Sequence, residues 1–110
     1  MTSKAFSKIA LSFPQTEEAP HFDRKAYRVT GKRIFATLHE TSGSVNLKLS
    51  TIDQSVFSSY PKGNIYPVNN KWGLQGWTTF EIKHLDEAVI REALMSAYND
   101  VMQPKPKRKR

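Results

Sequence analysis

The sequence contains no cysteine among its 110 residues. That absence excludes a disulfide framework, a thiolate zinc site and a cysteine nucleophile, and it fits a reducing compartment. Long apolar runs are also missing, so no segment is expected to span a membrane. The apolar residues of positions 1–15 are interrupted by Ser7, Lys8 and Ser12, unlike the core of a signal peptide. We therefore expect a cytoplasmic protein.

Signals of catalysis are equally scarce. The three histidines, His21, His39 and His84, lie far apart and match no metal-ligand spacing. His39 and Glu40 are adjacent at the end of an expected strand, where neighbouring side chains point to opposite faces, so they form no ready acid–base pair. The chain has no GxGxxG, P-loop or GxSxG motif. We expect no enzymatic activity, no bound metal and no cofactor.

Positive charge is plentiful, but it is unevenly placed. The formal net charge is +7, and without five basic residues at the C-terminus the remaining chain would carry only +2. Residues 104–110 have nothing apolar to bury, so we expect a disordered tail after one domain of residues 1–103. Such a tail could contact DNA or another polyanion, act as a nuclear address in a eukaryote, or only add solubility. Its basic residues are Lys105, Lys107, Arg108, Lys109 and Arg110.

The stretch from residue 26 to residue 49 carries the clearest pattern. Side chains alternate in type, and glycine-containing turns at 30–32 and 40–44 break the alternation. This predicts three antiparallel strands over residues 22–29, 33–39 and 45–49.

The rest of the chain completes a two-layer arrangement. Apolar spacing predicts helices over residues 2–13, 50–60 and from Asp86 onward, and two further strands over residues 65–68 and 77–82. Residues 15–20 are expected to form a connector, and residues 69–76 a loop. The order α-β-β-β-α-β-β-α indicates an α+β domain in which an antiparallel sheet of about five strands has helices over one face.

Basic residues crowd the first two expected strands, with Tyr27 and Phe35 between them. On one sheet surface they could bind phosphates, while aromatic rings stack on bases. The alternative is a solvated strand face whose charges prevent edge pairing. The cations in question are Arg24, Lys25, Arg28, Lys32 and Arg33, with Lys48 from the third strand.

Residues 66–77 form the second candidate site. They hold Lys71, Trp72 and Trp77 beside glycines and asparagines, and tryptophan near a cation is a common contact anchor. This loop could stack on bases or bind a protein or peptide. The alternative is that both indoles pack beneath the loop and pin it to the sheet.

Pieces spread in order along the chain resemble the MmcQ/YjbR family. They are LSFP at residues 11–14, PHF at 20–22, YRV at 27–29, VNLKLS at 45–50, NKWG at 70–73 and GWT at 76–78. The resemblance implies a compact α+β domain similar to type III secretion chaperones, and a DNA-binding role without catalytic residues or a cofactor. Many members carry histidines where this chain has residues 68–73, a stretch that contains none here.

The basic cluster and the family resemblance together predict a non-enzymatic protein that binds DNA non-specifically. Its alternative is a protein- or peptide-binding module that uses the loop of Trp72 and Trp77. No membrane partner is expected, and a monomer is the default. The predicted phosphate contacts are the tail cations with Arg24, Lys25, Arg28, Lys32, Arg33, Lys48 and Lys71, and Trp72 is the predicted stacking residue.

Overall fold

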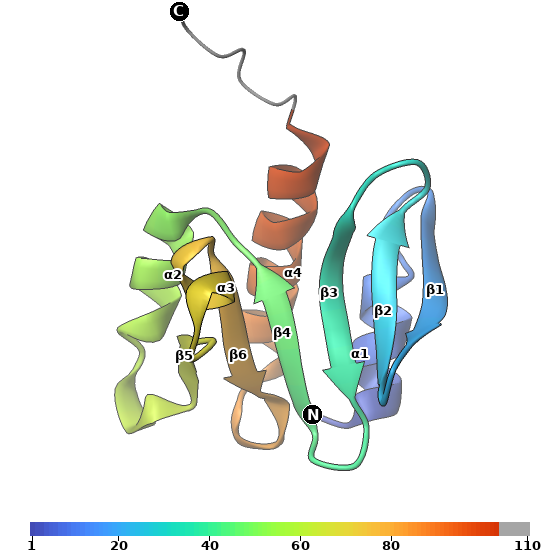
Figure 1. The fold of residues 1–110 in the computed structure, drawn as a ribbon. Coiled ribbons are helices and arrows are strands. Elements are labelled where there is room, and N and C mark those ends of the chain that lie inside the picture. Colours follow the sequence, from blue (N-terminus) through green and yellow to red (C-terminus); the bar gives the residue numbers. More distant parts are fainter. Residues whose placement is uncertain (104–110) are drawn as a thin grey trace, which may run out of the picture.

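The computed structural model describes residues 1–103, which form one six-stranded antiparallel sheet with helices packed against it (Figure 1). The strand order is β1-β2-β3-β4-β6-β5. The expected disorder of residues 104–110 lies outside the described residues. In chain order the elements are α1 (Ser3–Ala10), β1 (Thr16–His21), β2 (Arg24–Val29), β3 (Ile34–His39), β4 (Ser44–Lys48), α2 (Thr51–Ser58), η1 (Pro61–Gly63), β5 (Ile65–Pro67), α3 (Lys71–Leu74), β6 (Trp77–Glu81), η2 (Ile82–His84) and α4 (Glu87–Met102).

The α+β class and the antiparallel meander are confirmed, but the sheet has a strand that the sequence did not predict. The segment expected as a connector is β1, which pairs with β2 along its whole length. Acidic residues are uncommon in strands, so β1 lacks a typical strand pattern. They are balanced by the basic residues of β2 beside it. Glu17 lies opposite Arg28, and their side chains form an ion pair of 2.5 Å. Opposite charges facing each other across a strand pair are stabilising. The two strands therefore stabilise each other, although neither has a typical strand sequence.

One face of the sheet carries the core. Leu38 pairs with Val45, Val45 with Phe80, and Phe80 with Ile65, so these four side chains form one row across the helix-covered face. All are at most 2% exposed. Phe57 of α2 packs edge-on against Phe80, which places α2 on the same side of the sheet.

The long C-terminal helix matches its prediction closely. Its buried residues are Ile90, Ala93, Leu94 and Ala97, and these belong to the apolar rows expected from the spacing. Asp86, where the helix was expected to begin, is the N-cap residue, although its side chain makes no capping hydrogen bond. No helix within residues 1–103 is long and apolar enough to cross a membrane.

A β-bulge in β3 overturns the predicted side-chain alternation there. Tyr27 pairs with Ala36, but the next residue, Arg28, pairs with Ile34. The extra residue is Phe35, and a bulge places neighbouring side chains on one face. Phe35 is therefore fully buried against Tyr98 of α4. Strict alternation over the expected strand 33–39 groups Ile34 with Ala36 and puts Phe35 on the other side, and this expectation was wrong because the bulge turns Ile34 to the face opposite Ala36.

Tyr27 joins the sheet to the first helix through a buried hydroxyl. Its ring is fully buried and meets Phe6 edge-on, and its Oη donates to Ser7 Oγ at 2.8 Å. Burial raises the pKa of Tyr27 to about 12. The folded protein therefore holds this proton more tightly than the unfolded chain does.

We expect Tyr27 to make stability fall at alkaline pH. Its contribution is complete below pH ~10, the ordinary tyrosine value, and is lost as pH rises toward about 12. At pH 8, Tyr27→Phe should lower the free energy of unfolding by about 1 kcal/mol, because the hydrogen bond of the hydroxyl is lost. The variant should not show the further loss of roughly 2–3 kcal/mol that the wild type shows at alkaline pH. Urea unfolding of both proteins from pH 8 to 12 should show their order of stability reverse. A constant gap would contradict the assignment.

Candidate functional site

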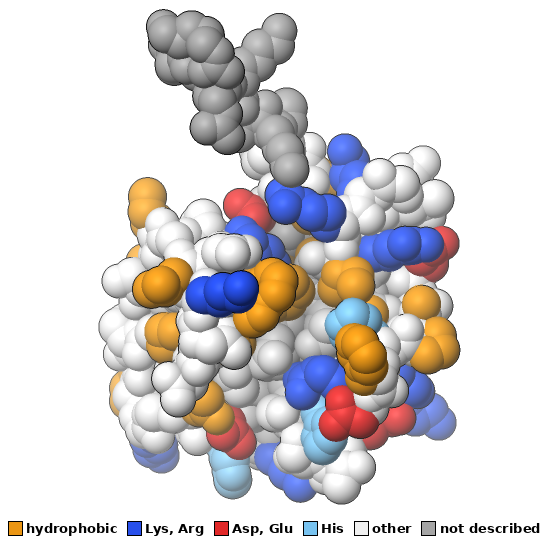
Figure 2. Space-filling model, in the orientation of Figure 1, with side chains coloured by type: hydrophobic (Ala, Val, Ile, Leu, Met, Phe, Trp, Pro, Cys, Tyr) orange, Lys and Arg blue, Asp and Glu red, His pale blue; other side chains and the backbone are white. Residues whose placement is uncertain are grey.

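The face of the sheet opposite the core is hollowed into a groove of about 910 Å³. Its floor follows from the strand register: Ala26 pairs with Thr37, Thr37 with Asn46, and Asn46 with Thr79. Thr37 and Asn46 both line the groove, so this row marks the open face. Lysine, arginine and hydrophobic side chains adjoin on the face seen in Figure 2.

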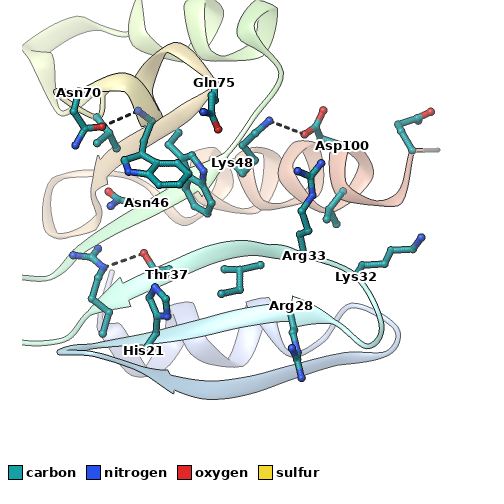
Figure 3. A pocket seen from close by; sticks show the side chains of 17 residues that line it. His21, Arg28, Lys32, Arg33, Thr37, Asn46, Lys48, Asn70, Gln75 and Asp100 are labelled. Atoms are coloured by element: carbon teal, nitrogen blue, oxygen red, sulfur yellow. Dashed lines mark hydrogen bonds and ion pairs between the residues drawn. The ribbon is translucent and has the colours of Figure 1, made fainter. Parts of the chain in front are cut away.

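The wall on the β2–β3 side is basic. The bulge described above turns Ile34 onto this wall, and the turn after β2 brings two further cations to the rim. Opposite it, on the far side of the sheet's midline, lies a wall of aromatic and amide groups carried by α3 and β6 (Figure 3). The predicted cations that line the groove are Arg24, Arg28, Lys32, Arg33 and Lys48.

Arg24 is tied to the floor of the groove by its guanidinium group. Its Nε donates to Thr37 Oγ1 at 2.9 Å on the groove floor, and a terminal nitrogen approaches the Ser44 carbonyl at 3.5 Å. Burial lowers the pKa of Arg24, while nearby Asp23 raises it, and an arginine remains charged throughout. A fixed guanidinium that has already lost part of its water is a favourable anion contact.

The other four cations differ in whether an acid already holds them. Arg28 is paired with Glu17, and Lys48 Nζ lies 3.4 Å from Asp100 Oδ2. Among residues 1–103, no carboxylate lies within ion-pair distance of Lys32 or Arg33. These two exposed side chains are therefore the most available to an incoming anion.

The opposite wall is built on a short helix where the sequence predicted a loop. Asn70 caps α3, since its Oδ1 accepts from the Trp72 backbone N–H at 2.8 Å. Gln54 Nε2 donates to the carbonyls of Gly73 and Trp77 and so ties α2 to both ends of this wall. Trp72 is 50% exposed at the groove, so the alternative in which both indoles pack beneath the loop is wrong for this residue.

Two predicted contacts do not reach the groove. Lys25 lies within 3.3 Å of Glu40 and 3.9 Å of Glu18, because it alternates with Arg24 on β2 and faces away. Lys71 is exposed on α3 beside Trp72 but does not line the groove. The tail cations from Lys105 to Arg110 lie outside the described residues.

The structure adds polar residues to the site that the sequence did not single out for binding. Thr37 and Asn46 are polar residues at strand positions that face away from the core, and this is the only sequence signal for their place in the site. The remaining additions come together only when the chain folds: His21 at the end of β1, Gln75 after α3, and Asp100 and Gln103 at the end of α4.

Comparisons with known proteins agree on the fold. The sequence profile named YjbR matches residues 11–100. A Deinococcus radiodurans protein described as containing the domain DUF419 is similar in structure, with a TM-score of 0.77, 15% identity, and coverage of 93% of this chain and 79% of that one. A Pseudomonas syringae protein has a TM-score of 0.71, 18% identity, and coverage of 92% and 99%. Among curated proteins, no match is found.

Proposed function

We propose, from the premise that this chain belongs to the YjbR family, that it binds DNA without strong sequence preference, through phosphate contacts in the open-face groove. The observation that carries the proposal is the convergence of five cations on one groove, while only one carboxylate, Asp100, lines it within residues 1–103. Cations that displace the counterions of a nucleic acid provide most non-specific affinity. A cytoplasmic location and a contribution from the tail cations belong to the same proposal.

The proposal is for a binding protein rather than an enzyme. The lining acid is engaged by Lys48, so it is a poor candidate for a general base. The histidine at the rim, His21, is exposed, and it lies against the ring of Phe22 rather than beside an acid.

Salt dependence separates the groove from the tail. We expect a full-length variant in which all five tail cations are glutamine to keep measurable affinity for duplex DNA at 50 mM salt. If Arg24, Lys32 and Arg33 each neutralise one phosphate, its log–log salt slope should be about −2.7, at about −0.9 per phosphate. The wild-type chain should be steeper. Fluorescence anisotropy with a labelled duplex measures both; no binding by the variant to any nucleic acid would refute a role for the groove.

An exposed hydrophobic end of α3 favours the alternative function, binding of a protein segment. Leu74 is 82% exposed beside Trp72, and apolar side chains of this kind anchor protein contacts. A pull-down that recovers the same specific partner with wild type but not with Leu74→Ala would support this alternative. Equal recovery from both proteins would count against it.

A further inference from the structure

We infer that the groove binds single-stranded nucleic acid in preference to duplex, with an unpaired base stacked on Trp72 and the phosphates held by the basic wall. This inference rests on the proposed function and specifies its ligand. It also predicts a behaviour that phosphate contacts alone do not give, namely dependence on an aromatic side chain.

The first argument is the placement of Trp72. Its indole is half exposed, yet the backbone beneath it is fixed by the Asn70 cap and by Gln54. An exposed indole in a groove that is also lined by cations is the arrangement that holds single strands, since every base has a face that can stack.

The second argument is a second aromatic ring at the opposite rim. Phe22, at the tip of the β1–β2 hairpin, is 95% exposed and has φ +60°. Such a conformation is unfavourable for a bulky residue, and strained residues of this kind cluster at functional sites. Its ring packs edge-on against His21, which lines the groove. Phe22 does not itself line the groove, but through His21 it places an exposed aromatic ring next to it.

The floor of the groove presents one free amide group, that of Asn46. Asn46 Oδ1 accepts from the Thr79 hydroxyl at 2.7 Å, which directs its NH₂ group elsewhere. No acceptor for that NH₂ is found among residues 1–103. An amide donor in a groove that also holds an exposed indole and several cations matches the acceptors on the edges of an unpaired base.

Shape decides between the two forms of nucleic acid. Proteins that read a duplex insert a protruding helix or ribbon into its major groove, which is ~12 Å wide. Here the cations and Trp72 line a recess. A duplex resting on this recess would offer phosphates to the cations, but its bases remain paired and stacked inside. Trp72 would then have no base to meet, so only a single strand satisfies both walls.

Binding of a labelled dT oligonucleotide and of a duplex of equal length to the full chain tests this inference. We expect the single strand to bind at least ~10-fold more tightly at 150 mM salt. Trp72→Ala should weaken dT binding by ~5- to 100-fold, because base–aromatic stacking contributes roughly 1–3 kcal/mol, and should leave duplex affinity within twofold. Ile52→Ala removes an exposed apolar side chain of α2 that does not line the groove; this variant is the control and should change neither. Trp72→Phe should retain most of the affinity.

Each contrary outcome has a distinct meaning. Duplex binding that equals or exceeds dT binding, or loss of both on Trp72→Ala, would overturn the inference while leaving the proposed function intact. If neither nucleic acid binds, both the inference and the proposed function are wrong. Polyglutamate is the probe for an acidic protein segment: if it binds as tightly as dT and shows the same dependence on Trp72, the occupant is a peptide and the inference is wrong.

Discussion

Replacing Gly76 by alanine is expected to destabilise the fold by about 4 kcal/mol, a large part of the roughly 5–15 kcal/mol typical of a domain. A Cβ at this position would lie 1.9 Å from the Leu49 carbonyl oxygen, and φ is +108°. Overpacking costs ~1–3 kcal/mol and a positive φ about 1–2 kcal/mol. The chain cannot move aside cheaply, because the Leu49 N–H also donates to the Gly76 carbonyl at 3.0 Å. Thermal unfolding should show Tm lowered by about 20 °C.

The chain contains a matched control for this substitution. Gly63 also has a positive φ, +67°, but nothing lies within 4 Å of a Cβ built there. Gly63→Ala should therefore lose only the conformational part, about 1 kcal/mol. If both variants unfold at the same temperature, the close contact of Gly76 with Leu49 does not constrain the junction of β4 and β6.

The largest expected effect on binding is that of reversing the two available charges. Lys32→Glu combined with Arg33→Glu should raise the Kd for dT by roughly 100-fold at 50 mM salt, since two phosphate contacts are lost and two repulsions are added. The effect should shrink as salt increases, because screening weakens attraction and repulsion alike. Fluorescence anisotropy with a labelled oligonucleotide measures both trends.

A control with the same change in net charge distinguishes a site from a general field. Lys4 and Lys8 are exposed on α1, which packs on the helix-covered face of the sheet. Lys4→Glu combined with Lys8→Glu should change the Kd by only a few-fold. Equal losses from the two double variants would mean that overall charge, and not the groove, attracts the nucleic acid.

Sequence patterns predicted the elements whose own side chains carry the signal. In β4, Val45 and Leu47 alternate with Asn46 and Lys48, and the buried and half-buried positions follow that alternation. β1 carries no such signal, because its stability comes from the strand beside it. Pairing of Glu17 with Arg28 is a property of two segments together, and no window along one of them contains it.

The candidate site, like the fold, was predictable in part. Arg24 and Arg28 were expected on one side of a strand, and both line the groove. The bulge at Phe35 could not be anticipated, since it depends on how β3 fits both Tyr27 and α4. Lys25 was predicted among the binding cations because it is close to them in the sequence. Strand alternation instead turns its side chain toward Glu18 and Glu40.

The end of α4 determines where the basic terminal segment is attached. Gln103, which follows Met102 at the end of the helix, itself lines the groove. The next seven residues of the sequence carry five cations. Because they are covalently linked to Gln103, any contact that these cations make with a strand held in the groove would be intramolecular. Tethering of this kind would lengthen the residence time of the complex without adding any affinity to the groove itself.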